Sequence, residues 1–217
     1  MWFDPLPDAP DWSKAERHLS KADPKLAAVI RQVGPCQIKP LPDPYLALVL
    51  SIFSQQLSFK GAETLYAKFR GRFTKKTPTP RKVLAALNPS SDRVWDDEAI
   101  RSCGISRQKR SYMIDLSQRI VDGRLKLDEL ATLSDEDVIT KLVEVKGIGV
   151  WTAHMYLLFV LLRGDVLPVG DLGLREGFRR VFRLDERPDE ATMQRLAEPW
   201  HPWCSVATWY LWKAKGD

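Results

Sequence analysis

The sequence contains little cysteine. Its 217 residues include three cysteines, Cys36, Cys103 and Cys204, which are widely separated and form no C-x-x-C pair. An odd number at such spacings argues against a disulfide framework, a structural zinc site and a four-cysteine iron–sulfur cluster. We expect three buried, unreactive thiols and no iron–sulfur cofactor.

Long hydrophobic runs are also missing. The longest apolar run, from Met155 to Leu162, has eight residues, whereas a membrane-spanning helix needs about 20. The first residues, Met1 to Pro5, lack the basic and apolar regions of a signal peptide. We therefore expect no membrane partner and a cytoplasmic protein, or a nuclear one if the source is eukaryotic.

Alternating β-patterns bounded by hairpin turns are scarce, whereas helix start and stop signals recur. Asp23-Pro24 and Asp43-Pro44 place a capping carboxylate before a proline, at the point where the missing N–H costs nothing. These signals predict an all-α protein. The expected helices start near Asp11, Asp23, Asp43, Ser58, Arg81, Ser91 or Asp92, Ser106, Ser134 and Val150, and the last runs to Leu162.

The composition is that of an ordinary globular protein with an excess of basic residues. The net charge is +5 and the isoelectric point is about 9.1, which is compatible with a polyanionic partner. Basic side chains gather at 68–76, 107–110 and 175–183. Charge alone is weak evidence, because solvated helix faces and helix C-termini account for any one of these clusters about as well.

The segment 145–153, VKGIGVWTA, is the most informative stretch of the chain. It predicts two apolar helices joined by a glycine turn, a helix-hairpin-helix in which Gly147 and Gly149 adopt positive φ or allow close approach of a ligand. The unpaired amides of such a turn can hold a phosphate of the DNA backbone without reading sequence. Lys146, Gly147, Ile148, Gly149 and Thr152 are the candidate phosphate-binding residues, although Thr152 is explained almost as well as a helix-start residue.

Asp171 follows Gly149 by 22 residues, in the sequence Leu-Pro-Val-Gly-Asp-Leu-Gly. An aspartate before a helix is usually only an N-cap, and position alone favours that interpretation. A carboxylate held near a sugar can also stabilise positive charge there and orient an attacking water. Both roles are compatible in one residue.

Taken in order, these motifs resemble a known family. The segments 52–58, 145–153 with Asp171, and 200–212 are similar to those of the helix-hairpin-helix DNA glycosylase superfamily, and most similar to its AlkA-like branch, the 3-methyladenine DNA glycosylases II. The resemblance implies two helical lobes with the active site in the cleft between them. Residues 57–163 would form a central six-helix bundle and 1–56 plus 164–217 a second bundle, with no room for the N-terminal β-domain of enterobacterial members.

The resemblance also implies an activity. Asp171 would assist hydrolysis of the N-glycosidic bond of alkylated purines in double-stranded DNA, leaving an abasic site. Members that also cut the strand carry a lysine in the residue pair after the second hairpin glycine, and here that pair is Val150-Trp151. The resemblance therefore implies a monofunctional glycosylase.

A flipped base needs a pocket, and the gap in the DNA stack needs a plug. By resemblance Trp151, Trp212, Met155 and, less strongly, Trp209 line the pocket, although core packing is an equal alternative for Trp209. Gln56, with Gln55 beside it, falls at the family's intercalating position. Cys204 departs from the family, since it stands where arginine is common, which removes a phosphate contact or an ion pair.

Three hypotheses remain open on the sequence. The first is the alkylated-base glycosylase. The second is a glycosylase of the same fold for a neutral lesion such as hypoxanthine or uracil, and the third is a non-catalytic DNA-binding protein in which Asp171 only caps a helix. His18 and His201 show no metal-ligand spacing, so we expect no catalytic metal. A monovalent cation between the hairpin carbonyls and phosphate, and a monomeric state, fit all three.

Overall fold

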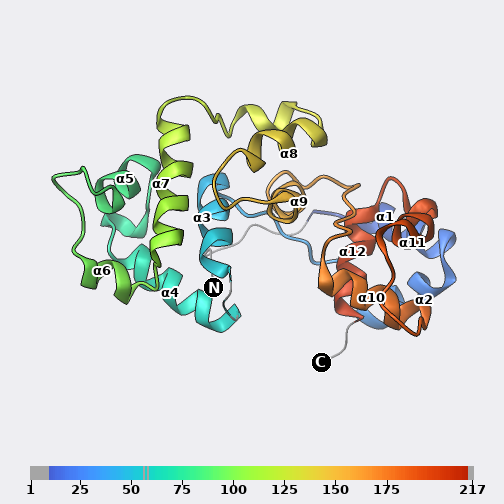
Figure 1. Ribbon diagram of the computed structural model, residues 1–217. Coiled ribbons are helices and arrows are strands. Elements are labelled where there is room, and N and C mark those ends of the chain that lie inside the picture. Colours follow the sequence, from blue (N-terminus) through green and yellow to red (C-terminus); the bar gives the residue numbers. More distant parts are fainter. Residues whose placement is uncertain (1–9, 56, 58, 215–217) are drawn as a thin grey trace. The chain divides into compact units, whose positions relative to one another are not determined.

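The computed structural model describes residues 10–55, 57 and 59–214 (Figure 1). Helices and the loops between them make up this part of the chain, and it contains no β-strand. The all-α prediction is confirmed. Among the described helices, none combines the length and the apolar character that crossing a bilayer requires.

The chain forms two compact units, and the first is Leu41–Tyr156 within the described residues. Its helices are α3 (Pro44–Ser54), α4 (Phe59–Gly71), α5 (Pro80–Leu87), α6 (Asp97–Ser102), α7 (Arg107–Val121), α8 (Asp135–Val143) and most of α9 (Val150–Phe159). Two 3-10 turns, η1 (Thr74–Lys76) and η2 (Glu129–Thr132), lie in the connections. Helix α7 packs against α5 and α3, and α3 also packs against α4.

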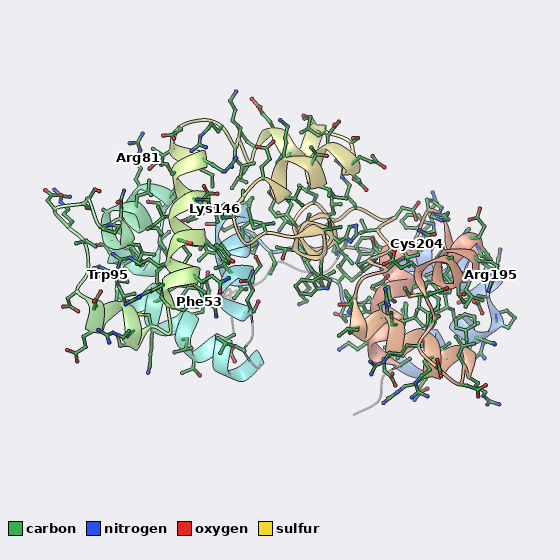
Figure 2. The ribbon with its side chains drawn as sticks, viewed as in Figure 1. Phe53, Arg81, Trp95, Lys146, Arg195 and Cys204 are labelled. Atoms are coloured by element: carbon green, nitrogen blue, oxygen red, sulfur yellow. The ribbon has the colours of Figure 1, made fainter. Side chains whose placement is uncertain are left out.

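The core of unit 1 is rich in aromatic side chains. Phe53 at the end of α3 lies 5.1 Å from Phe69 of α4 between ring centroids, and Phe73 lies 5.1 Å from Trp95. Figure 2 labels Phe53 and Trp95 in this cluster. Aromatic rings bury large apolar areas, and tilted or edge-to-face pairs at such distances add about 0.5–1.5 kcal/mol each. The cluster therefore ties the C-terminal end of α3 to α4 and to the loop before α6.

The boundaries of unit 1 differ from the predicted 57–163. Helix α3, predicted to belong to the second domain, lies in unit 1, because the Tyr45 hydroxyl is 2.8 Å from the Ser117 hydroxyl of α7 and the Lys109 ammonium of α7 donates to the Phe53 carbonyl at 2.7 Å. Burial lowers the pKa of Lys109. The chain passes to the second unit after Tyr156, inside α9, and not at residue 163.

Within the described residues, unit 2 combines 10–40 with 157–214. Its helices are α1 (Ser13–Ala22), α2 (Pro24–Val33), α10 (Leu172–Phe182), α11 (Glu190–Ala197) and α12 (Cys204–Lys213), with a 3-10 turn η3 (Glu198–Trp200). Helix α12 is the centre of the core, since every residue from Cys204 to Leu211 is buried. Gly177 lets α10 approach α12 closely: a Cβ there would lie 2.6 Å from the Leu211 carbonyl oxygen.

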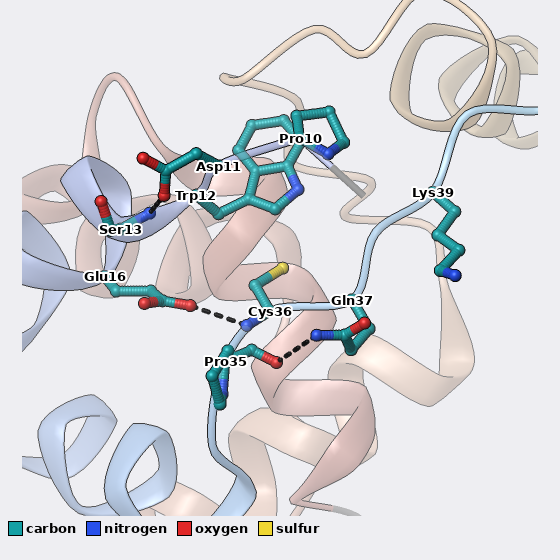
Figure 3. A pocket seen from close by; sticks show the side chains of 9 residues that line it. All are labelled: Pro10, Asp11, Trp12, Ser13, Glu16, Pro35, Cys36, Gln37 and Lys39. Atoms are coloured by element: carbon teal, nitrogen blue, oxygen red, sulfur yellow. Dashed lines mark hydrogen bonds between the residues drawn. The ribbon is translucent and has the colours of Figure 1, made fainter. Parts of the chain in front are cut away.

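A half-buried carboxylate, Glu16, joins the two sequence-distant parts of unit 2. The Glu16 carboxylate of α1 accepts from the Cys36 amide at 2.6 Å and from the Tyr210 hydroxyl of α12 at 2.9 Å. Figure 3 shows the first of these bonds beside a cavity of about 480 Å³. None of the predicted site residues lines this cavity, which is bounded by 10–13, Glu16, 35–37 and Lys39.

Local signals place most helix starts correctly. Asp23, Asp43, Ser106 and Ser134 each accept a backbone N–H as N-caps, as predicted. Three predictions are wrong. Trp12, not Asp11, occupies the N-cap position of α1, although the Asp11 carboxylate accepts from the Ser13 amide at 2.9 Å. Asp96, not Ser91 or Asp92, caps α6, and α9 ends at Phe159 instead of Leu162. Leu162 has φ +51°, a left-handed conformation that cannot continue a helix.

Candidate active site and nucleic-acid contacts

The hairpin between α8 and α9 is a tight glycine turn in unit 1. Gly147 has φ +81°, and a Cβ at this position would collide with the Tyr112 ring of α7. The Ile148 amide donates to the Val145 carbonyl at 3.0 Å, and the Ile148 side chain is buried. Glycine is therefore favoured at position 147 for two reasons, the positive φ and the lack of room for a Cβ beside Tyr112. Gly149 does not have positive φ, which corrects the expectation for it.

Neighbouring side chains hold the hairpin from α7 and α3. The Asp115 carboxylate accepts from the Lys146 amide at 2.9 Å and from Arg119 Nε at 3.1 Å. The Gln55 side-chain amide donates to the Gly147 carbonyl at 2.7 Å. The amides of Lys146 and Ile148 are thus already used within the protein.

The remaining hairpin amides can receive an anion. Within the described part of the chain, the amides of Gly149 and Val150 donate to no acceptor, as is usual for the first residues of a helix. A Cβ built on Gly149 meets nothing within 4 Å, so the backbone is open there. The side chain of Lys146, labelled in Figure 2, is exposed and adds positive charge to the turn. This arrangement suits a phosphate of a DNA backbone.

The predicted intercalating pair is placed only in part. Gln56 lies outside the described residues. Gln55 ends α3, and its amide is engaged with the hairpin carbonyl. In this structure Gln55 supports the hairpin, and its predicted contact with the DNA stack would require that bond to break.

Residues at the start of α9 differ in exposure. Trp151 is 46% exposed, which is unusual for a tryptophan. Met155, one turn later, is half-buried. Thr152 is only 7% exposed, so its hydroxyl has little access to a phosphate, and its contact with DNA stays a prediction.

Asp171 is the N-cap of α10 in unit 2, which confirms the capping role predicted for it. Its Oδ1 accepts from the Leu174 amide at 2.6 Å and from the Trp212 indole N–H at 2.9 Å. The carboxylate is half-buried. Two donors from two helices thus fix its orientation, and the second of them is not needed for capping.

The indole that reaches Asp171 is itself held by stacking. The Trp212 ring lies 6.1 Å from the Phe159 ring, with an interplanar angle of 14°, and is half-buried. Trp209 is 8% exposed and belongs to the core of unit 2, with Lys213 Nζ 5.5 Å from its ring centroid. The structure therefore favours the core interpretation for Trp209, whereas Trp212 lies directly at the carboxylate.

A second polar cluster lies in unit 2, at the start of α12. His201 Nδ1 is 2.7 Å from Asp165 Oδ2, and the Cys204 Sγ is 3.6 Å from the same ring nitrogen. Although burial opposes it, hydrogen bonds from His201 and Cys204 lower the pKa of Asp165, and burial raises the pKa of the Cys204 thiol. The sequence interpretation of His201 overlooked its H-x-x-C spacing with Cys204.

Comparison with known proteins places this geometry in a family. Residues 49–202 match the model of the HhH-GPD superfamily base excision DNA repair proteins. The chain belongs to this superfamily. The HhH-GPD match includes the hairpin, Asp171 and the Asp165–His201 pair.

Individual HhH-GPD relatives are similar over almost the whole chain. DNA-3-methyladenine glycosylase 1 of Schizosaccharomyces pombe is 34% identical, with 93% of this chain and 86% of that protein covered. The alkylbase DNA glycosidase-like protein mag2 of the same organism is 29% identical, with 94% and 93% covered. The solved structure of S. pombe 3-methyladenine DNA glycosylase (Mag1) in complex with abasic DNA has a TM-score of 0.79 at 32% identity, covering 92% of this chain and 95% of that one.

Several residues at these HhH-GPD sites were not predicted. Tyr112 and Asp115 fix the hairpin from α7, and Phe159 and Gly173 surround the Asp171–Trp212 contact. No local pattern marks the residues of α7, because they are 31 or more positions from their partners. Gly173, two residues after the predicted carboxylate, was visible in the sequence as a small residue beside it.

Proposed function

We propose that this protein is a DNA glycosylase of base excision repair, which hydrolyses the N-glycosidic bond of alkylated bases in double-stranded DNA and leaves an abasic site. Family membership and the names of its relatives support the reaction class. The observation in this chain that carries the proposal is the Asp171 carboxylate, held by the Leu174 amide and the Trp212 indole.

In the proposed reaction the protein contributes mainly electrostatic stabilisation and positioning of the reacting groups. When the bond between C1′ and the base breaks, its electron pair leaves with the base and positive charge develops on the sugar. A fixed carboxylate stabilises that charge, and water then forms the new bond to C1′ and loses a proton to Asp171 or to solvent. A base such as 3-methyladenine is already cationic, so it leaves without a strong general acid.

Aromatic rings suit a flat, cationic base, because stacking and cation–π attraction act together. Trp151 is accessible and Trp212 lies at the carboxylate, so both are proposed contacts of the flipped base, with Met155 as an adaptable neighbour. The open amides of Gly149 and Val150 are proposed to hold a phosphate of the backbone. A cation at the hairpin would share the Gly147 carbonyl with Gln55.

We further propose that the enzyme does not cut the DNA strand. Neither Val150 nor Trp151 supplies the amine with which strand-cutting members of the superfamily attack the sugar. The proposed reaction uses water and a carboxylate and involves no cofactor. Abasic product should therefore stay uncut until alkali is added.

The test is release of free base from randomly methylated duplex DNA by wild type and by Asp171→Asn. Asparagine is a good N-cap, so the variant should fold and bind DNA, while base release should fall roughly 100- to 1,000-fold, the range seen when one electrostatic contact in an active site is removed. Asp189→Asn is the matched control, since Asp189 caps α11 through the Thr192 amide at 2.8 Å.

The control should release bases at the wild-type rate. Equal rates for Asp171→Asn and wild type would assign Asp171 to capping alone. Absence of base release by wild type, with duplex binding intact, would favour a neutral lesion or a DNA-binding role.

A further inference from the structure

Three side chains of different elements converge at the start of α12, and they form the group called here the Asp165 cluster: Asp165, His201 and Cys204. Each offers one metal-ligand atom, and these atoms lie within 4.8 Å of one another. All three residues belong to unit 2. We propose that the Asp165 cluster binds a divalent metal ion of the zinc class.

The ligand atoms lie close enough to one another for one ion to gather them after small side-chain movements. In a tetrahedral site, zinc–sulfur and zinc–nitrogen bonds of about 2.3 and 2.05 Å place the two ligand atoms about 3.6 Å apart. Cys204 Sγ and His201 Nδ1 are 3.6 Å apart. Because Sγ is also 4.0 Å from Nε2, it lies beside the imidazole ring, and the ring has to turn before one ion can contact both Sγ and Nδ1. Asp165 Oδ1 and Oδ2 are 2.9 and 2.7 Å from the same nitrogen, against about 3.4 Å in a tetrahedral site. The carboxylate therefore has to withdraw by about 0.5–0.7 Å.

Charge and donor type fit as well. A thiolate, a carboxylate and a neutral imidazole together carry a charge of −2, which balances one divalent cation. On binding, the thiol proton and the Nδ1 proton that is hydrogen-bonded to Asp165 are both released to solvent, and the neutral imidazole, with its remaining proton on Nε2, binds the metal through Nδ1. The soft sulfur, the imidazole and the oxygen form a mixed set that zinc or cobalt(II) accepts and that magnesium or calcium does not.

The exposed side of the cluster leaves the fourth ligand position to water. The Asp165 and His201 side chains are 38% and 50% exposed, whereas Cys204 is fully buried behind them. The same loop is tied to α12 through Ser205, whose hydroxyl donates to the Arg163 carbonyl at 2.6 Å and accepts from the Val166 amide at 3.0 Å. A metal at this point would lock the segment before Asp171 onto the helix that carries Trp212.

The experiment is a titration of the purified, metal-free full chain with Co²⁺ alone and then with Zn²⁺. Wild type should bind one Co²⁺ with a thiolate-to-cobalt charge-transfer band in the near ultraviolet, Zn²⁺ should displace the cobalt, and Zn²⁺ should raise Tm. Cys204→Ser should lose the band and weaken binding by more than about 100-fold, since even outer-shell changes cost about 10–100-fold. Cys36→Ser is the control, because Cys36 is the other buried cysteine of unit 2.

Two further variants protect the test against a folding defect. His201→Ala should lose metal binding and keep all three thiols, while Cys204→Arg should fold without metal, since a guanidinium beside Asp165 neutralises the carboxylate directly. The proposal would be overturned if wild type bound less than one metal ion per chain, or if Cys204→Ser bound the metal as tightly as wild type. The cluster would then be an Asp165–His201 ion pair only. Both outcomes are independent of base release.

Discussion

At the scale of single residues, unit 2 contains the same contact twice, with different expected consequences. Asp23 and Asp171 are both N-caps that accept an indole N–H, from Trp200 at 3.2 Å and from Trp212 at 2.9 Å. Trp200 is fully buried, whereas Trp212 is half-buried. Comparing the two contacts therefore separates the effect of losing an indole–carboxylate hydrogen bond on stability from its effect on the rate of the proposed reaction.

Trp212→Phe keeps an aromatic ring and removes the N–H that orients Asp171. We expect base release to fall about tenfold, equivalent to about 1.4 kcal/mol, with Tm little changed because the ring still stacks on Phe159. Trp200→Phe should instead lower the free energy of unfolding by about 1–3 kcal/mol and leave the rate of the folded protein unaltered. Single-turnover base release measures the rate, and thermal unfolding measures the stability. A loss of rate in Trp200→Phe but not in Trp212→Phe would contradict the role of Trp212 in orienting Asp171.

Gly173 is the second residue of α10, and its missing side chain leaves room for the carboxylate. A Cβ there would lie 3.1 Å from Asp171 Oδ1 and 3.4 Å from Trp212 Cδ1. Gly173→Ala should displace the carboxylate by a few tenths of an ångström and lower base release about tenfold, while a helical alanine adds up to about 1 kcal/mol of stability.

Stability and rate should therefore move in opposite directions, measured by denaturant unfolding and base release on the same preparation. Gly170→Ala serves as the control, because a Cβ at Gly170 meets nothing within 4 Å. A Gly173→Ala enzyme as fast as wild type would show that the position of Oδ1 is not critical.

At the scale of elements, the two glycines of the hairpin have separable roles. Gly147→Ala should destabilise the protein by about 2 kcal/mol or more, since it combines left-handed backbone with a collision against Tyr112. Gly149→Ala should leave Tm unchanged and weaken duplex binding about tenfold or more, because its methyl group would occupy the space in front of the open amides.

Thermal unfolding and duplex binding at one fixed salt concentration test the two variants together. Binding by Gly149→Ala at wild-type affinity would mean that phosphate does not approach this turn.

Helix starts were predictable because their signals are local. Ser106, Ser134, Asp43 and Asp171 act within four residues of their own position. The contacts that fix the hairpin were not predictable, since Gln55 and Gly147 are 92 positions apart and Asp115 and Lys146 are 31 apart. Such pairs depend on how α3 and α7 pack, which no local pattern encodes.

At the scale of the whole molecule, the sequence motifs indicated the helical class and the family, whereas the division into units depended on packing. The predicted boundary at residue 57 followed the family motif, but the apolar helix before it buries Leu46, Leu48 and Val49 within unit 1. The Asp165 cluster was missed for a similar reason. Its histidine and cysteine are three residues apart, but the carboxylate lies 36 residues before the histidine.

Some of the basic residues that give the molecule its positive net charge form ion pairs within the protein, which the composition alone does not reveal. Arg179, Arg180 and Arg187 all contact Glu176 at 2.7–3.1 Å, so one carboxylate holds three guanidiniums in place within unit 2. Hydrogen bonds from Arg179 and Arg187, with a further one from Arg180, lower the pKa of Glu176 from 4.5 to about 2. Part of the basic cluster at 175–183 therefore has a structural role in unit 2.

This network gives the molecule a defined pH dependence. A carboxylate whose pKa is lowered by folding stabilises the native state above its ordinary pKa, and the contribution is lost as the pH falls through the folded value. Tm of wild type should exceed that of Glu176→Gln most clearly above about pH 5, and the two should converge as the pH falls from 4.5 towards about 2. Glu190→Gln is the control: Glu190 is 60% exposed and pairs with Arg175, so its replacement should shift Tm little at any pH. A Tm difference for Glu176→Gln that stays constant from pH 7 to 2 would mean that shape, and not charge, holds the three arginines together.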